Sequence, residues 1–416
     1  MAIFKTSDRG KRLLPILCAA FATTLTTAVP TLAGDDVTTA ITDGKFSVNI
    51  RYRFEFVEQD GKSNDAYANT VRTRIGYETG DFHGFILGAE IENVLGIGSE
   101  RYNDTINGKT NYPVVADPEN TEANQYYIGF NGVPETKIKI GRQRLFLDNQ
   151  RFVGTVGFRQ NEQTFDAARL TTNVIPDVTA TYAYVFLVNR IFGEDSPVGD
   201  FESNSHLLNV SYSGIPFGKL TGYGYLLDLD EAPTLSSKTF GARFAGKQAL
   251  SEPWSMFYAV EAAMQSAHAN NPTKGNFKYY LIEPGIAYQT FKARIGYEVL
   301  TGNGRQAFQT PLATLHAFQG WADKFLTNPA TGMEDRYVRL DYVAKGLDFL
   351  DGTKLIGVYH DFNAQSSSAD YGSEVDFMIS RKVYDYFTVE LKYANYDAKD
   401  SATDTEKFWA SVTFKY

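Results

Sequence analysis

Cysteine and long apolar runs are both nearly absent from this chain. Cys18 is the single cysteine among 416 residues, and no apolar run of membrane-helix length follows the first thirty-odd residues. A disulfide framework and a thiolate metal site are therefore excluded for the body of the chain. A membrane-spanning helix needs about 20 consecutive apolar residues, so helical spans are not predicted there either.

Tryptophan is scarce as well, whereas the other aromatic residues are abundant. The chain has 3 Trp against 26 Tyr and 30 Phe. Many aromatic rings without long apolar runs are typical of a membrane β-barrel. Its strands place a side chain against lipid only at every second position, and its rings gather at the two membrane interfaces.

The chain has no excess of basic charge and no recognisable catalytic motif. Its formal net charge of −9 argues against nucleic acid as a partner. The five histidines show no zinc-binding spacing, and neither a serine elbow nor a nucleotide-binding loop is present. The sequence therefore predicts no enzyme, no metal site and no cofactor. A barrel enzyme assembled from distant strands remains an alternative that the sequence does not exclude.

Residues 1–33 are predicted to be a secretory signal peptide. Four basic residues among the first twelve precede an apolar run at 13–25, and small residues around Ala33 suit cleavage by a signal peptidase. The alternative is a membrane anchor, but the apolar run is shorter than the ~20 residues that an anchor needs. Residues 34–416 are then expected to form a single domain.

An alternation of apolar and polar residues with period two runs through that domain. Phe46, Val48 and Ile50 alternate with Ser47 and Asn49, and the segment 408–416 alternates in the same way. This pattern lets one sheet face lipid on one side and water on the other. A soluble β-sandwich alternates too, but its strands usually run ~5–6 residues, whereas these segments are about twice as long.

Connection lengths predict the number of strands. Short turns alternate with long loops in a membrane barrel, and both termini lie at the same end. Counts from the two termini agree only if the doubtful segment 151–158 belongs to a loop. The prediction is an all-β fold, a transmembrane antiparallel up-and-down β-barrel of about 18 strands. Its long outer loops are expected at 97–122, 144–162 and 302–335, and its lumen is expected to hold water. The candidate strands start near residues 46, 68, 84, 123, 135, 162, 177, 204, 218, 236, 253, 276, 291, 336, 353, 371, 386 and 406.

Arginines gather on the predicted water-facing side of the first two strands. Arg51 and Arg53 share that side with Arg72 and Arg74. Like charges that face each other on one sheet destabilise it. This basic ladder therefore needs acidic partners or serves to attract anions. Candidate partners are Glu55, Glu78, Glu90 and Glu92, and further arginines that the alternation turns inward are Arg169, Arg243, Arg294 and Arg339.

Arg142 and Arg144 do not fit the alternation. Ile138 and Ile140 are expected to face lipid, so the same parity would turn both arginines outward. Two explanations are open. Gly141 marks a β-bulge that resets the alternation, which we favour slightly, or the strand has by then reached the outer headgroups.

The longest predicted loop, 302–335, is unusually apolar. It contains Trp321, Phe308, Phe318 and Phe325. An exposed apolar loop of this size would be a liability, so we expect it to fold inward as a constriction or lid. The alternative is a surface loop with its own small cluster.

Two segments resemble the alginate-export family of outer-membrane porins. They are GRQRLFLDNQRFVGTVGFRQNEQTFDAARL at 141–170 and QTPLATLHAFQGWADKF at 309–325. The resemblance implies a monomeric barrel of eighteen strands that exports an anionic polysaccharide passively through an arginine-lined constriction. It also implies pore or constriction roles for Arg142, Arg144, Arg151 and Arg159. Separately, the apolar content of the loop 302–335 makes His316, Trp321, Asp323 and Lys324 the expected lid residues.

Residues and resemblance together predict a passive channel in the outer membrane of a Gram-negative bacterium. Its solute is expected to be an anionic or neutral saccharide, such as alginate, and the many acids on the wall weaken the case for strong anion selectivity. The expected partners are outer-membrane lipid and the barrel-assembly machinery, which reads an aromatic C-terminal residue such as Tyr416. The alternatives are a general small-solute diffusion porin and, from other classes, a barrel enzyme or an adhesin.

Overall fold

The computed structural model describes residues 36–416, so the predicted signal peptide at 1–33 lies outside the described residues. A short helix, α2 (Val37–Thr42), precedes eighteen strands. The strands are β1 (Lys45–Gln59), β2 (Ala66–Glu78), β3 (Phe85–Gly96), β4 (Asn120–Val133), β5 (Thr136–Gln143), β6 (Thr164–Thr172), β7 (Val178–Asn189), β8 (Asp200–Ile215), β9 (Gly218–Leu226), β10 (Ser237–Ser251), β11 (Trp254–Ala267), β12 (Asn276–Tyr288), β13 (Phe291–Thr301), β14 (Gly332–Val343), β15 (Lys354–Asn363), β16 (Asp370–Val383), β17 (Phe387–Ala398) and β18 (Thr405–Lys415).

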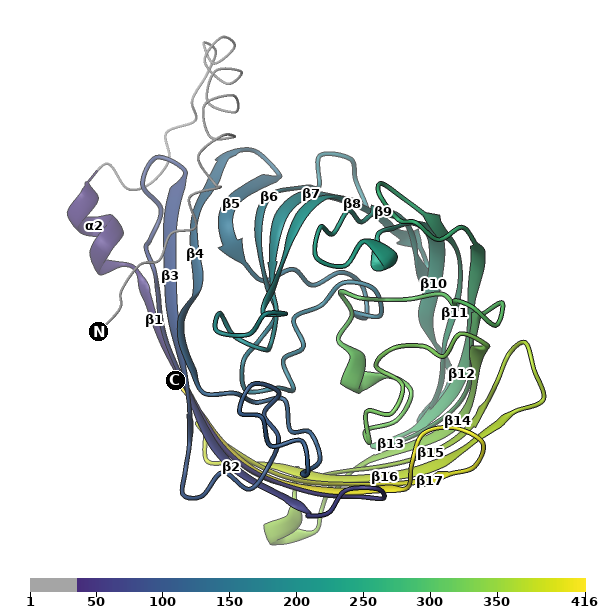
Figure 1. Ribbon diagram of the computed structural model, residues 1–416. Helices are drawn as coiled ribbons and strands as arrows, with labels where there is room; N and C mark the ends of the chain where they lie inside the picture. Colours follow the sequence, from purple (N-terminus) through teal and green to yellow (C-terminus); the bar gives the residue numbers. More distant parts are fainter. Residues whose placement is uncertain (1–35) are drawn as a thin grey trace.

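The strands form one closed barrel. Each strand pairs antiparallel with its neighbours in sequence, and β1 also pairs with β18 to close the ring. Viewed as in Figure 1, the strands surround an interior that several loops cross. The predicted all-β barrel of eighteen strands is confirmed, and every strand begins within four residues of its predicted start. The doubtful segment 151–158 forms no strand and lies in the loop between β5 and β6.

Burial in this barrel is reversed relative to a soluble protein. On β1, Phe46 is 56% exposed, whereas Arg53 and Glu55 are 2% and 1% exposed. Large apolar side chains are exposed on most other strands as well, for example Ile91 on β3 and Ile295 on β13. A soluble domain hides such residues and leaves its charges in water. An apolar outer surface around a polar interior is what lipid on one side of the sheet requires.

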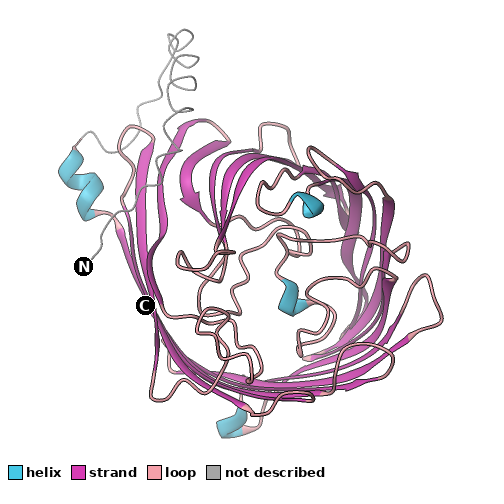
Figure 2. Ribbon diagram, viewed as in Figure 1, coloured by secondary structure: helices cyan, strands magenta, loops and turns pink. Residues whose placement is uncertain are grey.

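The connections differ sharply between the two ends of the barrel. At the end that holds both chain termini, most connections are short, for example 134–135, 216–217 and 289–290, and the longest is 344–353. The three longest connections, 97–119, 144–163 and 302–331, all lie at the opposite end. Figure 2 shows loops, drawn in pink, folding back into the ring of strands. None of the helices in residues 36–416 combines the length and the apolar content needed to cross a bilayer.

An apolar core therefore lies inside the barrel and is built from loops and wall together. Phe152 of the loop 144–163 and Phe308 of the loop 302–331 pack against each other and against Tyr279 of β12. Trp321 and Phe325 belong to the same cluster. Barrels of this size usually leave an aqueous lumen. Here the inward loops fill part of that lumen with packed side chains.

Candidate functional site: the lumen and its loops

Two long loops are joined to each other inside the barrel. Val153 and Leu312 form an isolated parallel bridge, and the Gly154 N–H donates to the Leu312 carbonyl at 2.9 Å. The side-chain amide of Gln163 donates to the same carbonyl at 3.0 Å. The loops 144–163 and 302–331 therefore form one unit, within which we call residues 309–325 the lid.

Arg51 and Arg53 hold this unit against the first hairpin. Arg51 donates to the carbonyls of Gly157 and Arg159. Arg53 donates to the Phe158 carbonyl at 2.5 Å and forms an ion pair of 2.7 Å with Asp117 of the loop 97–119. The guanidinium groups thus bind loop backbone and a buried carboxylate, and Arg53 has almost no surface left for water.

Arg74 of the hairpin and Arg144 of the loop 144–163 are paired with carboxylates. Arg74 forms ion pairs with Glu92 and with Glu162, and Arg144 forms ion pairs with Glu162 and Glu90. Burial alone would raise the pKa of Glu162, but Arg74 and Arg144 outweigh that effect and hold the pKa below its usual value. Three of the four acids suggested by the sequence are partners of arginines from this region, since Glu55 also accepts from Arg159.

Arg72 and Glu78 have other partners. Arg72 faces Arg51 directly across the hairpin and donates to Asn49. Glu78 accepts a hydrogen bond of 2.5 Å from the Tyr127 hydroxyl instead of pairing with an arginine.

Arg151 and Arg159, both in the loop 144–163, connect that loop to the barrel wall, and Arg159 also connects it to the lid. Arg151 is 0% exposed and forms an ion pair of 2.7 Å with Glu298 of β13. Arg159 forms ion pairs with Glu55 at 3.1 Å and with Asp323 of the lid at 2.9 Å. Both side chains are enclosed, so the structure places them in the loop packing and not on an open pore surface.

Arg142 lies on the outward face of the sheet, contrary to the bulge that the sequence favoured. It is in register with Tyr126 and Asp166, and no register shift occurs at Gly141 in either pairing. Arg142 therefore shares its face with Ile140, and it donates to Asp166 at 2.8 Å. The left-handed φ of +123° at Gly141 accommodates a close approach to the Tyr126 carbonyl and does not reset the alternation. Arg144 follows the end of β5, where the strand alternation no longer applies.

His316 sits at the centre of the lid's contact with the wall. Its Nδ1 lies 2.8 Å from an oxygen of Asp323, and its Nε2 lies 2.7 Å from the Lys392 ammonium of β17. Because an ammonium group only donates, Nε2 accepts and Nδ1–H donates to Asp323. Burial lowers the pKa of His316 to about 3, which keeps the ring neutral.

The remaining lid residues surround that contact. Lys392 lies over the Trp321 ring at 3.9 Å, and Asp323 also pairs with Lys407 of β18 at 3.4 Å. Burial would raise the pKa of Asp323, but His316 and Lys407 together hold it well below its usual value. Lys324 lies nearer the rim and donates to Thr405 at 2.7 Å.

A hydrated chamber lies beneath the lid, on the side of the barrel away from the first hairpin. It is a cavity of about 230 Å³, bounded by Trp321, Phe318 and Gln319 of the lid. Arg243 of β10, Arg294 of β13 and Arg339 of β14 line its wall. We call these three the chamber arginines.

The chamber arginines keep access to water although each has an acidic partner. Arg243 pairs with Glu261 at 2.7 Å, while Arg294 and Arg339 share Asp341 at 3.7 and 2.9 Å. Their side chains are 14%, 25% and 27% exposed, compared with 3% for Arg53. Arg294 also pairs with Glu283 at 3.2 Å. The three guanidinium groups therefore keep part of their surface open to the lumen while three carboxylates lie beside them.

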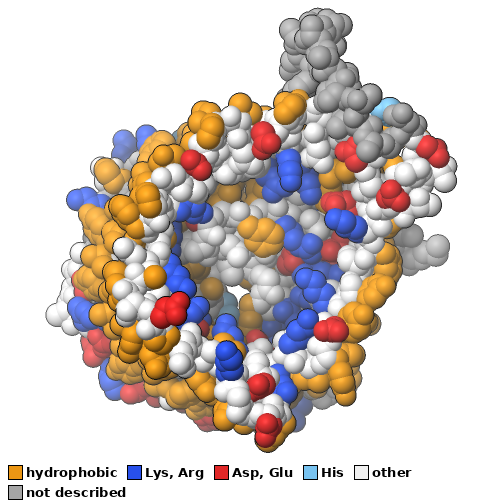
Figure 3. All heavy atoms as spheres, turned by 180° about the vertical axis from the view of Figure 1, so that it is seen from behind, with side chains coloured by type: hydrophobic (Ala, Val, Ile, Leu, Met, Phe, Trp, Pro, Cys, Tyr) orange, Lys and Arg blue, Asp and Glu red, His pale blue; other side chains and the backbone are white. Residues whose placement is uncertain are grey.

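Basic side chains continue along the lumen toward the termini. Arg169 of β6 is paired in register with Lys139 of β5 and donates to the Arg144 carbonyl at 3.5 Å. Figure 3, which shows the face opposite to that of Figure 1, displays a hollow with Lys and Arg side chains gathered on its wall. Within residues 36–416, no group of three or more His, Cys, Asp or Glu side chains is arranged to hold a metal ion.

Asp117, Glu162 and Lys392 were not among the residues singled out from sequence. Asp117 and Glu162 lie in the loops 97–119 and 144–163, where no alternation assigns a direction to a side chain. Lys392 does lie on a regular strand, and its position opposite Trp409 and Met378 could have marked it as inward.

A model of the alginate export family matches residues 43–312 of this chain. The chain belongs to the alginate export family. The match covers the barrel from before β1 into the lid, and it includes the segment 141–170 that resembled the family in sequence. No curated protein matches the chain.

Solved barrels from Pseudomonas aeruginosa and Acinetobacter baumannii share the fold of this family member. Pseudomonas aeruginosa OpdO superposes with a TM-score of 0.71 at 14% identity, over 91% of this chain and 98% of that one. P. aeruginosa OpdK, solved with vanillate, gives 0.72 at 13% identity over 90% and 99%. Acinetobacter baumannii OccAB2 gives 0.71 at 16% identity over 91% and 99%. At these identities the likeness shows a common fold.

Proposed function

We propose that this protein is a passive outer-membrane channel whose solutes are anionic, with anionic saccharides as the preferred class. The observation that carries the proposal is the chamber, in which water-accessible arginines line the wall beneath the lid. Guanidinium groups stay charged at working pH and bind carboxylates through paired hydrogen bonds. A solute in the lumen would meet the chamber arginines after it passes the lid.

The acidic partners of these arginines suit transport better than tight binding. Each carboxylate competes with the solute for the same guanidinium group, so no single position binds an anion strongly. Conduction requires contacts that are strong enough to admit a solute and weak enough to release it. Basic side chains farther along the lumen, such as Arg169 and Lys139, would provide the next contacts.

The wider cellular assignments form part of the same proposal. Secretion rests on the sequence of the segment 1–33, insertion by the barrel-assembly machinery on the aromatic Tyr416, and a monomeric state on the family resemblance. Long loops facing the outside are inferred from the arrangement of the connections. The vanillate in the OpdK structure is a small aromatic carboxylate, which is consistent with passage of carboxylates through a barrel of this fold. No chemical reaction and no cofactor are part of this function.

A general small-solute porin is the second candidate, and one observation favours it. Acids lie beside nearly every inward arginine, for example Glu283 at 3.2 Å from Arg294. If these acids neutralise the wall fully, the channel would pass small solutes of either sign.

Reversal potentials of single channels in a salt gradient distinguish the two functions. Replacing the chamber arginines together, by Arg243→Gln, Arg294→Gln and Arg339→Gln, leaves Glu261, Glu283 and Asp341 unpaired in the lumen. The reversal potential is expected to move toward cation preference, and the shift should shrink at 1 M salt, where the Debye length is about 3 Å.

Arg336→Gln is the matched control, because Arg336 lies on β14 as well but is exposed on the outer face beside Asp361. It should leave the reversal potential unchanged. A wild-type channel without ion preference, or a triple variant with wild-type preference, would favour the general porin instead.

A further inference from the structure

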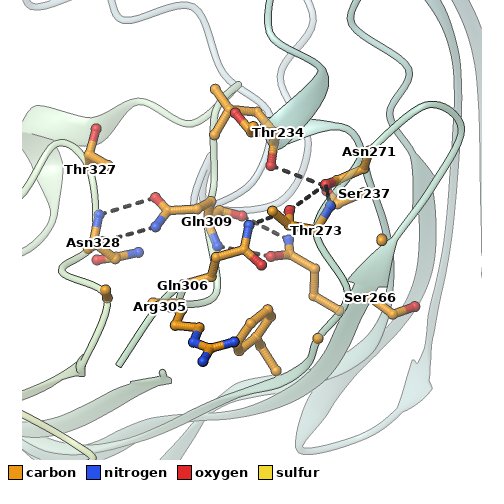
Figure 4. Close-up of a pocket in the computed structure, with 17 residues that line it drawn as sticks. Thr234, Ser237, Ser266, Asn271, Thr273, Arg305, Gln306, Gln309, Thr327 and Asn328 are labelled. Carbon is orange, nitrogen blue, oxygen red and sulfur yellow. Dashed lines mark hydrogen bonds between the residues drawn. The ribbon is translucent and has the colours of Figure 1, made fainter. Parts of the chain in front are cut away.

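A second cavity lies at the long-loop end of the barrel. It has a volume of about 220 Å³ and is enclosed by the ends of β10, β11 and β12 and by the loops 227–236, 268–275 and 302–331 (Figure 4). Its polar lining is almost entirely uncharged, in contrast to the chamber. The uncharged polar residues that matter here are Ser237, Gln265, Asn271, Thr273, Gln309 and Asn328.

Paired side-chain amides hold this cavity in shape. The Gln309 side chain bonds the Asn328 backbone near the other end of the inward loop, donating to its carbonyl at 2.9 Å and accepting from its N–H at 3.1 Å. Gln265 of β11 in turn bonds the Gln309 backbone at 2.8 and 2.9 Å. Figure 4 shows Gln309 and Asn328 facing each other at this cavity. The cavity is thus bounded by fixed groups, as a preformed binding site requires.

Two buried polar atoms at this cavity lack a partner. Ser237 and Asn328 are each 6% exposed. The Ser237 hydroxyl and the Asn328 side-chain carbonyl have no hydrogen-bond partner within residues 36–416. Leaving such groups unsatisfied destabilises a fold. The Ser237 hydroxyl can donate as well as accept, whereas the Asn328 side-chain carbonyl can only accept.

We propose that this cavity binds a single sugar ring of a glycan. A sugar presents hydroxyl groups that donate and accept, which matches the free Asn328 carbonyl and the free Ser237 hydroxyl. Phe277 supplies an apolar wall for the C–H face of the ring. The volume lies below the ~300–1,000 Å³ of pockets for drug-sized ligands, so it suits one ring and not a chain segment.

The site extends the proposed function, because it would dock a saccharide at the mouth before the chamber. Its uncharged lining recognises hydroxyl groups, whereas the chamber recognises negative charge. Arg305, exposed at the edge of the cavity, could add a contact to a carboxylate on an acidic sugar. Neutral and acidic glycans both present a sugar ring to this site, and the experiment below uses one probe of each class to distinguish them.

Isothermal titration of the full barrel in detergent tests the site, with maltotriose as the neutral probe and trigalacturonate as the acidic probe. Ser237→Ala removes one free hydroxyl and should weaken both probes about three- to tenfold. Ala267→Leu fills the cavity and should abolish binding of both. Arg305→Ala should weaken only trigalacturonate. Ser211→Ala, a buried serine of β8 that lines neither cavity, is the control and should bind both probes like wild type.

The proposal is overturned if the wild type binds neither probe at millimolar concentration, or if Ser237→Ala and Ala267→Leu both bind like wild type. Binding of trigalacturonate alone, abolished by Arg305→Ala and unaffected by Ser237→Ala, would also overturn it in favour of a simple anion site. A gel shift on boiling checks that each variant is folded, and Ser237→Ala carries the test if Ala267→Leu does not assemble. The chamber variant should bind maltotriose normally, so this site and the anion preference can fail separately.

Discussion

Arginines line two sides of this lumen, and the two sets have different surroundings. On the first hairpin, Arg53 is enclosed by the loop 144–163 and paired with Asp117. Across the barrel, Arg294 lines a hydrated chamber and shares Asp341 with Arg339. The residue type and the inward direction are the same in both places. The difference is what the loops do, because they pack onto the hairpin and leave the chamber wall accessible.

This difference separates two roles that a basic residue in a barrel can have. A guanidinium group that is enclosed by protein and bonded to a loop stabilises the packing of that loop but cannot exchange partners with a solute. One that shares its acid with a neighbour and contacts water can. We therefore expect changes on the hairpin side to alter stability, and changes around the chamber to alter ion preference.

Removal of the lid should have the largest effect on conduction. Replacing residues 309–325 with a short Gly-Ser linker removes Trp321 and Leu312 from the apolar core inside the lumen. Single-channel conductance is expected to rise several-fold, because the lid fills space that water and ions would otherwise use. The gel shift on boiling should persist, since the barrel's ladder of strand pairs is untouched. Unchanged conductance would mean that the lid does not restrict the path.

Arg151→Ala should have a large effect on stability. It leaves the buried Glu298 carboxylate with the Tyr279 hydroxyl but without its cation. Loss of one partner of a buried ion pair costs about 3–5 kcal/mol. The urea midpoint of unfolding should fall accordingly. Arg336→Ala, which breaks exposed pairs on the outer face, should cost no more than about 1 kcal/mol.

Two matched substitutions, one on the first hairpin and one in the chamber, test whether the arginines of these two regions have different roles. Arg53→Met should lower the urea midpoint more than Arg294→Met, because it deprives both Asp117 and the Phe158 carbonyl of a charged donor, at about 1.5–3 kcal/mol per such bond. Arg294→Met should move the reversal potential more than Arg53→Met. The opposite ranking in both measurements would show that the hairpin arginines, and not the chamber arginines, face the solute.

A smaller effect is expected from pH, through His316. Its pKa falls from an ordinary 6.5 to about 3 on folding. The stability that the neutral ring provides is complete above pH 6.5 and is lost as the pH falls toward 3, at about 1.4 kcal/mol per pH unit. Protonation would give Nε2 a proton and oppose the Lys392 ammonium, so lid opening should become more frequent between pH 6.5 and 4.

Other charged groups surround His316 and the lid, so a variant of the ring itself is needed to assign the pH response. Arg159, Lys392 and Lys407 face the same position, and Glu374 of β16 accepts a hydrogen bond of 2.7 Å from the Ala322 N–H of the lid. Asp323 has a lowered pKa, so its contribution is lost only below about pH 4. Open probability of His316→Gln should be flat between pH 6.5 and 4. A wild-type pH response in that variant would assign the effect to another group.

The sequence predicted the direction of most arginines on the strands correctly, but not of all of them. Parity along regular strands correctly turned Arg53, Arg74 and Arg294 inward, because each lies in unbroken register with its neighbours. Parity was right about Arg142 as well, and the bulge proposed to override it was wrong. The roles of the lid residues as a gate remain a prediction that conductance measurements must test.

The sequence by itself determined the barrel, the number of strands and, where the register is unbroken, the side of the sheet toward which the alternation turns a residue. Lipid and water impose that order locally, residue by residue, since a strand exposes successive side chains to opposite faces. Only the tertiary structure decided which inward charges stay accessible. The accessibility of these charges depends on the long loops 97–119, 144–163 and 302–331. No alternation of apolar and polar residues predicts the direction of a side chain in such loops. They supply Asp117, Glu162 and backbone carbonyls from far along the chain to the arginines they cover.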